Sequence, residues 1–263
     1  MCRPAPIARG VRLGIRLVRG CSVSYRPLGA GQAATQGIYA TLMKKDAASQ
    51  GPDEGVIKFD VRLETAAADW PAAVRDLEAW RHILWQQGLV GVEKQPLEVG
   101  YGNVSMRLGG APAQPSFLIT ATQTGHKSRL TADDYVCVTA CSLHGNAVQA
   151  RGRARPSSES LAHHIIYRLR PDAGFVFHVH SALIWSQADR LGLPCTPADV
   201  AYGTPAMANA IAALFRDTDL PATRVLAMRG HKDGIIAFGA TADAAGTTLM
   251  AVLARALAAQ STL

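Results

Sequence analysis

Short apolar runs separated by turns constrain the fold more than any other feature of this 263-residue chain. Several runs follow each other through connections too short for the crossover that parallel neighbours need. Helix-like segments lie between other runs. The pattern predicts an α/β protein with a mixed, largely antiparallel sheet covered by helices. The expected strands are residues 56–63, 104–108, 117–120, 135–139, 175–180, 225–228 and 235–238.

Four segments carry helical patterns. Apolar side chains recur with a helical period up to Gly88, and Asp69 is the expected N-cap of this first helix. Residues 158–169 form the second expected helix, which ends before Pro171. Residues 205–215 and 242–259 complete the set. No internal repeat is present, so one domain accounts for all of these segments.

Composition excludes several classes of protein. Five cysteines without a C-x-x-C pair argue against a disulfide framework and favour a reducing, cytoplasmic location. We expect no apolar run to approach the roughly 18–20 residues of a membrane span, and therefore no membrane partner. Six units of the net charge of +7 lie in the first 42 residues, which hold six arginines and no acidic residue. Without them the charge is +1, and we expect no nucleic-acid partner.

The basic N-terminal segment has two interpretations. Its arginines recur at helical spacing among apolar residues and serines, which is the composition of an organelle transit peptide. A basic, disordered extension of no fixed function has the same appearance. We expect residues 1–45 to be such an extension, with organelle import as the alternative, and residues 46–263 to form the single folded domain.

A histidine pair on an expected strand suggests a metal site. In residues 175–180, Phe-Val-Phe-His-Val-His, the alternation places His178 and His180 on one face. Residues two apart in a strand lie about 6.6 Å apart, so both rings can reach one ion at about 2.0–2.1 Å. Such a pair is also common as two ordinary surface histidines. His231, in a turn between two apolar runs, is the candidate third ligand.

A carboxylate and several small polar turns accompany the histidines. Glu159 opens the second helix and is the candidate acid/base, although a glutamate there also serves as an ordinary helix cap. Ser157 and Ser158 precede it at a helix start, where anions such as phosphate bind. The turns at residues 102–105 and 124–127 offer further polar groups, and each also fits a plain turn. Three imidazoles, a base and a phosphate pocket together suit enediolate chemistry on a ketose.

The remaining histidines and the cysteines receive no role. His163 and His164 lie mid-helix, His82 lies on the first helix and His144 in a turn, and all four are expected to be structural or solvated. The two central cysteines, Cys137 and Cys141, are expected to be small core residues.

The motifs occur in an order that resembles the class II aldolase/adducin family over about residues 70–258. The segments that carry the resemblance are Gly102-Asn-Val-Ser105, Thr124-Gly125, Ser157-Ser-Glu159 with Arg170-Pro-Asp172, His178-Val-His180-Ser181, Tyr202-Gly-Thr204 and His231. The resemblance implies a three-layer α/β/α fold with a central, mainly antiparallel sheet. It also implies a divalent ion, usually zinc, near a subunit boundary of a homotetramer that acts on phosphorylated ketoses.

By carry-over from the family, His178, His180 and His231 would bind the metal and Glu159 would be the acid/base. The positions that would hold the substrate phosphate are Gly102, Asn103, Thr124, Gly125, Ser157 and Ser158.

This chain departs from the family pattern in two places. Lys232 and Asp233 separate His231 from Gly234, where the family commonly has His-Gly. No tyrosine between Ser181 and Tyr202 matches the one that family aldolases bring from a neighbouring subunit. A metal-dependent aldolase-type lyase is therefore the first hypothesis, with a sugar-phosphate dehydratase or epimerase as alternatives. A non-catalytic, adducin-like interaction module is the second.

Overall fold

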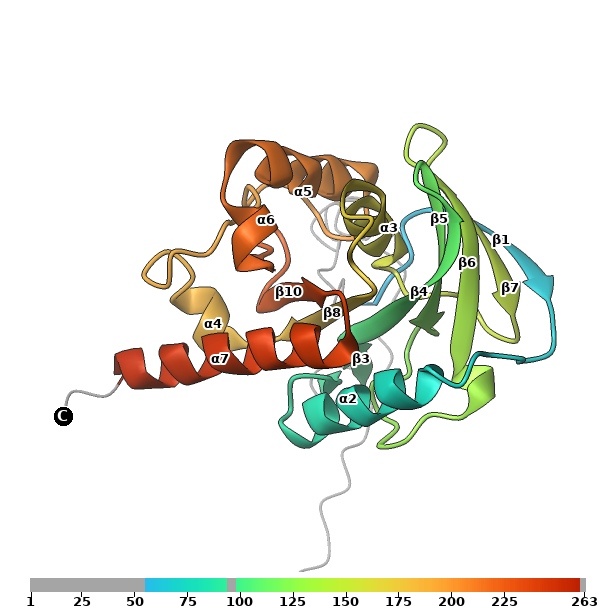
Figure 1. The fold of residues 1–263 in the computed structure, drawn as a ribbon, viewed down its shortest axis with the longest axis horizontal. Helices are drawn as coiled ribbons and strands as arrows, with labels where there is room; N and C mark the ends of the chain where they lie inside the picture. The colour runs from blue at the N-terminus through green and yellow to red at the C-terminus, as the bar shows by residue number, and fades with distance from the viewer. Residues whose placement is uncertain (1–54, 94–97, 261–263) are drawn as a thin grey trace, which may run out of the picture. The chain divides into compact units, whose positions relative to one another are not determined.

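The protein was analysed as a computed structural model that describes residues 55–93 and 98–260. The expected N-terminal extension lies outside the described residues. An eight-stranded sheet runs through the molecule in the order β1-β7-β6-β5-β4-β8-β10-β9 (Figure 1). Its strands are β1 (Asp60–Thr65), β4 (Asn103–Ala111), β5 (Gln114–Thr120), β6 (Tyr135–Ser142), β7 (Ala147–Gly152), β8 (Phe175–His180), β9 (Val225–Ala227) and β10 (Gly234–Gly239).

Neighbouring strands of this sheet are antiparallel except for β1 and β7, which pair in parallel. The predicted mainly antiparallel sheet is therefore confirmed. A separate two-stranded ribbon, β2 (Gly91–Glu93) with β3 (Val99–Tyr101), and β7 were not expected from the sequence. The sequences of β2, β3 and β7 are short or polar, and they contain no apolar run of the kind by which a strand is recognised.

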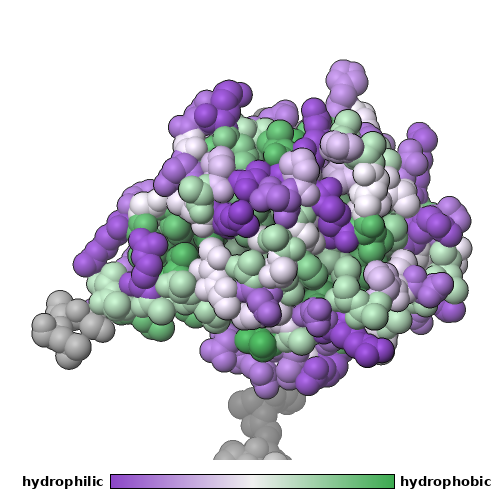
Figure 2. Space-filling model, viewed as in Figure 1, coloured by the Kyte–Doolittle hydropathy of each residue, from purple (hydrophilic) through white to green (hydrophobic). Residues whose placement is uncertain are grey.

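Helices cover both faces of the sheet, which gives the predicted three layers. One hydrophobic cluster joins the sheet to α3 (Ser160–Leu169), α5 (Pro205–Asp217) and α6 (Leu220–Thr223). A second cluster joins the opposite face to α2 (Val74–Gln86), α4 (Ala182–Ser186) and α7 (Ala242–Gln260). A 3₁₀ turn, η1 (Ala132–Asp134), precedes β6. In the view of Figure 2, hydrophilic residues are spread over the surface with small hydrophobic areas between them.

The strand β8 follows the predicted alternation. Val176 packs in the cluster under α3, whereas Phe177 and Val179 pack in the cluster under α2 and α7. His178 and His180 therefore share the α3 face of the strand with Val176. Burial of the apolar residues on both faces fixes this orientation.

Two expectations about the helices need correction. The first helix begins at Val74 with Ala73 at the N-cap, so the predicted cap at Asp69 is wrong. A turn closed by the Val74 N–H and the Pro71 carbonyl, 3.0 Å apart, precedes the helix instead. The alanine-rich helix α7 is also long and apolar enough to cross a membrane by length and composition alone, contrary to the expectation. It packs against β10, β8 and α2, as a core helix does.

Candidate metal centre and phosphate pocket

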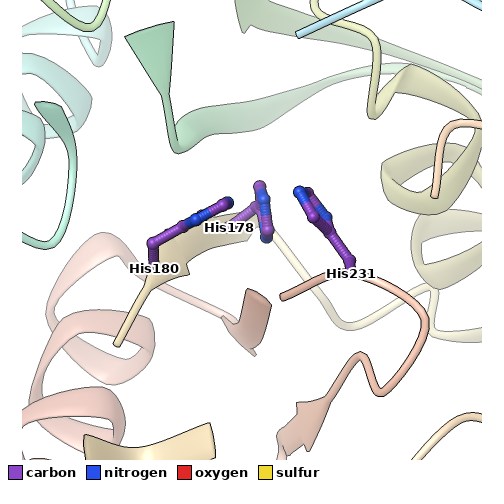
Figure 3. Close-up of side chains that lie close together, drawn as sticks. All are labelled: His178, His180 and His231. Carbon is purple, nitrogen blue, oxygen red and sulfur yellow. The ribbon is translucent and has the colours of Figure 1, made fainter. Parts of the chain in front are cut away.

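Three histidines converge at one end of the sheet. His178 and His180 come from β8, and His231 comes from the loop between β9 and β10 (Figure 3). One nitrogen from each ring lies within 4.8 Å of the corresponding nitrogens of the other two. The ring centroids are 4.7–5.2 Å apart. The structure thus brings together the three histidines that the sequence singled out.

The turn after β9 accommodates the two residues that separate His231 from the last strand. The Gly234 N–H donates to the His231 carbonyl at 3.0 Å, and Asp233 adopts a positive φ of 63°. Gly230 allows the loop to pass the Val200 carbonyl, because a Cβ there would lie 1.8 Å from that oxygen. The turn therefore absorbs both Lys232 and Asp233, and His231 still faces the histidines of β8.

The protonation of His178 suits a metal ligand. Its ring is fully buried, and its Nδ1–H can donate to the Ile235 carbonyl at 3.2 Å. This bond leaves Nε2 as the lone-pair nitrogen, and Nε2 has no hydrogen-bond partner in the described residues. Burial, with the neighbouring His231 and His180, holds the pKa of His178 well below its ordinary value. A neutral imidazole with a carbonyl behind it is the usual form of a metal-ligating histidine.

Aromatic rings hold the other two histidines. The Tyr101 ring stacks on His180 with a centroid distance of 5.0 Å, and the Tyr101 hydroxyl donates to the Gly88 carbonyl at 3.1 Å. The Tyr202 ring stacks on His231 at 4.3 Å. These contacts restrict the orientation of both imidazoles. The three-histidine group consequently fits a divalent ion in donor type, spacing and rigidity.

Glu159 lies beside this group and does not act as a simple helix cap. It occupies the N-cap position of α3, but its side chain makes no capping hydrogen bond. The carboxylate is 1% exposed, and its Oε1 lies 3.5 Å from Nδ1 of His231. The structure therefore directs this carboxylate to the histidines rather than to the backbone of its own helix.

A small pocket next to the histidines contains all six residues assigned to phosphate by the family resemblance. They come from the start of β4, the turn after β5 and the segment before α3, and are Gly102, Asn103, Thr124, Gly125, Ser157 and Ser158. Asn103 pairs with His178 across β4 and β8, so the pocket and the three-histidine group are direct neighbours.

Close packing shapes the pocket. A Cβ on Gly125 would lie 1.9 Å from the Gly91 carbonyl oxygen, so only glycine fits there. Gly102 has a positive φ of 75°, which glycine adopts without strain. Gln123, which the sequence motifs did not indicate, also lines the pocket and accepts from the Gly100 N–H at 2.8 Å.

The structure decides between the two interpretations of His163 and His164 in favour of a structural role. Both His163 and His164 are buried on α3, so neither is solvated. The Nδ1 of His163 lies 2.6 Å from the Ser105 hydroxyl, which lies 2.8 Å from the Tyr167 hydroxyl. Packing thus covers both side chains, although they are adjacent on the helix.

The family model described as class II aldolase and adducin N-terminal domain matches residues 89–260. The chain belongs to this family. The resemblance inferred from the motifs is thereby confirmed, and the match includes β8, the His231 loop and the whole candidate phosphate pocket except Gly55. Members of the class II aldolase family use a divalent metal, in agreement with the three-histidine group.

The chain is also similar to one protein of curated function and to two solved structures. A methylthioribulose-1-phosphate dehydratase of Gluconacetobacter diazotrophicus is 38% identical over 113 residues, which cover 43% of this chain and 46% of the relative. The match thus spans less than half the length of that relative. A sugar-phosphate aldolase from Thermotoga maritima aligns over 73% of this chain and 97% of its own, with a TM-score of 0.53 and 15% identity. An L-fuculose 1-phosphate aldolase aligns over 73% of this chain and 87% of its own, with a TM-score of 0.51 and 19% identity. At these identities the two structures show the shared fold.

Proposed function

We propose that this protein is a metal-dependent lyase that removes water from a phosphorylated ketose. The observation that carries the proposal is the grouping of three imidazoles, a buried carboxylate and a small polar pocket at one end of the sheet. The curated relative named a methylthioribulose-1-phosphate dehydratase supports the class of substrate and the elimination of water.

His178, His180 and His231 would hold the ion, which we propose to be Zn²⁺ because zinc readily accepts three histidines and keeps one position open. When bound, the cation supplies a Lewis acid that offsets negative charge developing on a carbonyl and its neighbouring hydroxyl. Stacking by Tyr101 and Tyr202 keeps two of the rings oriented. Rigid ligands favour catalysis because no reorganisation is required as the charge develops.

Glu159 would move the proton. In a ketose 1-phosphate, the phosphate pocket would hold the group on C1, and the carboxylate would take the proton from C3. The enediolate would then expel the C4 hydroxyl, which leaves as water with the proton returned by Glu159, and the enol that remains would become a 2,3-diketone. The burial of Glu159 keeps bulk water from competing for this proton.

Aldol cleavage and epimerisation use the same groups and remain the alternatives. Cleavage breaks the C3–C4 bond and releases dihydroxyacetone phosphate, and it requires an acid that family aldolases take from a tyrosine of a neighbouring subunit. The segment from Ser181 to Tyr202 holds no match for that tyrosine, which favours loss of water. A non-catalytic, adducin-like module would be expected to lose the histidines or Glu159, and this chain retains them.

We further propose a homo-oligomer, a homotetramer by family resemblance, in the cytoplasm. The domain would comprise residues 46–263, with residues 1–45 as an extension outside it. The family resemblance supports the assembly, and the odd cysteine count without paired spacing supports the compartment.

Metal content and product analysis test the function. The full chain should bind one divalent ion per subunit, His180→Ala should lose it while remaining folded by circular dichroism, and the exposed His144→Ala should keep it. Methylthioribulose 1-phosphate should yield a diketone, and Glu159→Gln should keep the ion but slow turnover by about 10²–10⁴-fold. Release of dihydroxyacetone phosphate from fuculose 1-phosphate would favour the aldolase instead. Full metal binding by His180→Ala would refute the site.

A further inference from the structure

The phosphate pocket has no charged side chain among its lining residues, all of which lie in the described part of the chain. A phosphate group bound there would depend on hydroxyls, amides and backbone N–H groups. Such neutral donors bind an anion well only when they are fixed in place and polarised by nearby charge. The surroundings of the pocket therefore matter as much as its lining.

A buried arginine contacts the back of this pocket. Arg81, on α2, is 1% exposed and is the largest fully buried side chain of the described residues. Its Nη2 donates to the Thr124 carbonyl at 2.9 Å, and its Nη1 donates to the Lys127 carbonyl. One guanidinium group thus binds both ends of the turn, at Thr124, which lines the pocket, and at Lys127, three positions later.

The bond to Thr124 acts directly on a pocket-lining peptide. The Thr124 carbonyl and the Gly125 N–H belong to the same peptide group, and both residues line the pocket. A charged donor on the carbonyl draws electron density toward that oxygen and makes the N–H a stronger donor. Arginine stays protonated even when buried, so this polarisation is permanent.

Two neighbours on α2 hold the rest of the loop. Nδ1 of His82 lies 2.8 Å from the Ser128 carbonyl. The Glu78 carboxylate accepts from the Leu130 N–H at 2.9 Å and from the Tyr135 hydroxyl at 2.7 Å. The helix that makes these contacts lies before residue 89, outside the segment matched by the family model. The loop is therefore clamped by an element that the family match does not include.

The charges around Arg81 nearly cancel, so its effect is local. Glu78 is close enough to interact electrostatically with the guanidinium, as is Asp134, whose Oδ1 pairs with Lys127 at 2.5 Å. Two basic and two acidic groups leave little net field at a distance. The guanidinium therefore acts by fixing the geometry of the 124–125 peptide and by polarising it.

We propose that Arg81 is a positioning residue for phosphate recognition, acting through the Thr124–Gly125 peptide. This inference rests on the proposed function, because it takes the pocket to be the phosphate site. Loss of the guanidinium should weaken binding of the phosphate group and leave the three-histidine group unaffected, since Arg81 contacts none of its members. A purely structural role would instead lower the stability and metal binding together.

Phosphate titration of the metal-loaded full chain tests this proposal. We expect Arg81→Met to raise the dissociation constant of inorganic phosphate about tenfold at unchanged metal content, and Arg81→Lys, which keeps the charge and loses the fork, to have a smaller effect. The exposed Arg75→Met on the same helix is the matched control and should bind as the wild type does.

The outcomes separate the two proposals. If the wild type binds phosphate and Arg81→Met binds it equally well, the role of Arg81 is refuted while the proposed function stands. If Arg81→Met does not fold, Arg81→Lys decides, and unchanged phosphate affinity in that variant refutes the role. If the wild type itself binds no phosphate, the pocket assignment fails and the inference falls with it.

Discussion

Acidification to pH 5 is expected to destabilise the fold through two adjacent buried histidines. Burial lowers the pKa of His163 to about 3, and burial together with the charge of Arg168 lowers that of His164 to about 4. The ordinary value for histidine is 6.5. Above pH 6.5 the folded and unfolded chains both hold neutral rings, so stability does not change. Between 6.5 and about 4 only the unfolded chain takes up the protons, and stability falls.

The expected loss is large compared with ordinary domain stability. At pH 5, about 1.5 pH units below the unfolded pKa, each histidine costs about 2 kcal/mol, and the pair costs about 4 kcal/mol. Folded domains have free energies of unfolding of only about 5–15 kcal/mol. The carboxylates of Asp134 and Asp172, whose pKa values lie below 3.8, act only at more acidic pH. Burial also lowers the pKa of His178, a candidate metal ligand, so His178 acts in the same direction as the pair.

Urea unfolding at pH 7.5 and pH 5.0 isolates one of the two histidines. His164→Asn removes one titrating group, so its free energy of unfolding should fall by about 2 kcal/mol less than that of the wild type over this range. The absolute stability of the variant does not affect this comparison, because the change in unfolding free energy between the two pH values is measured for each protein separately. Equal losses in the two proteins would show that His164 titrates normally in the folded state, and the reasoning from its burial would be wrong.

Two substitutions test the packing that positions the site. Gly125→Ala should destabilise the fold by at least about 1–3 kcal/mol, because its Cβ would meet the Gly91 carbonyl at 1.9 Å. Gly88 has a positive φ but open space around it, so Gly88→Ala should cost only about 1 kcal/mol in the same denaturation assay. Phe177→Ala, at a fully buried position, should cost about 3–5 kcal/mol, and Leu257→Ala, at a 53% exposed position, should stay within about 0.5 kcal/mol. Similar costs for both members of either pair would contradict the packing described here.

The strands of the sheet were largely predictable because they bury both faces. Residues 175–180 were expected as a strand and form β8 with the same bounds. The strand β7 was missed because its sequence, Ala-Val-Gln-Ala-Arg-Gly, buries only alternate residues and contains few apolar ones. Its parallel pairing with β1 was not predictable either, since nothing local in a sequence specifies which distant strand lies beside it.

The sequence identified the residues of the candidate site, but it did not predict how their side chains are placed relative to one another. His178 and His180 share a face by the strand period, but the approach of His231 depends on a turn with a positive φ at Asp233. Glu159 was indistinguishable from a helix cap until its side chain was placed. The role of Arg81 had no sequence signal, because an arginine on an amphipathic helix is normally exposed.

The core and the candidate site depend on the same strand register. Asn103 of the candidate phosphate pocket pairs with His178, and Gly234, three residues after His231, pairs with His180. A slip of one residue in β8 would turn both histidines to the face of α2 and α7, and would drive Phe177 and Val179 against α3. Burial of those two apolar residues therefore holds the imidazoles in position. Metal affinity should consequently fall in any variant that loosens the core around β8, even where no ligand is changed.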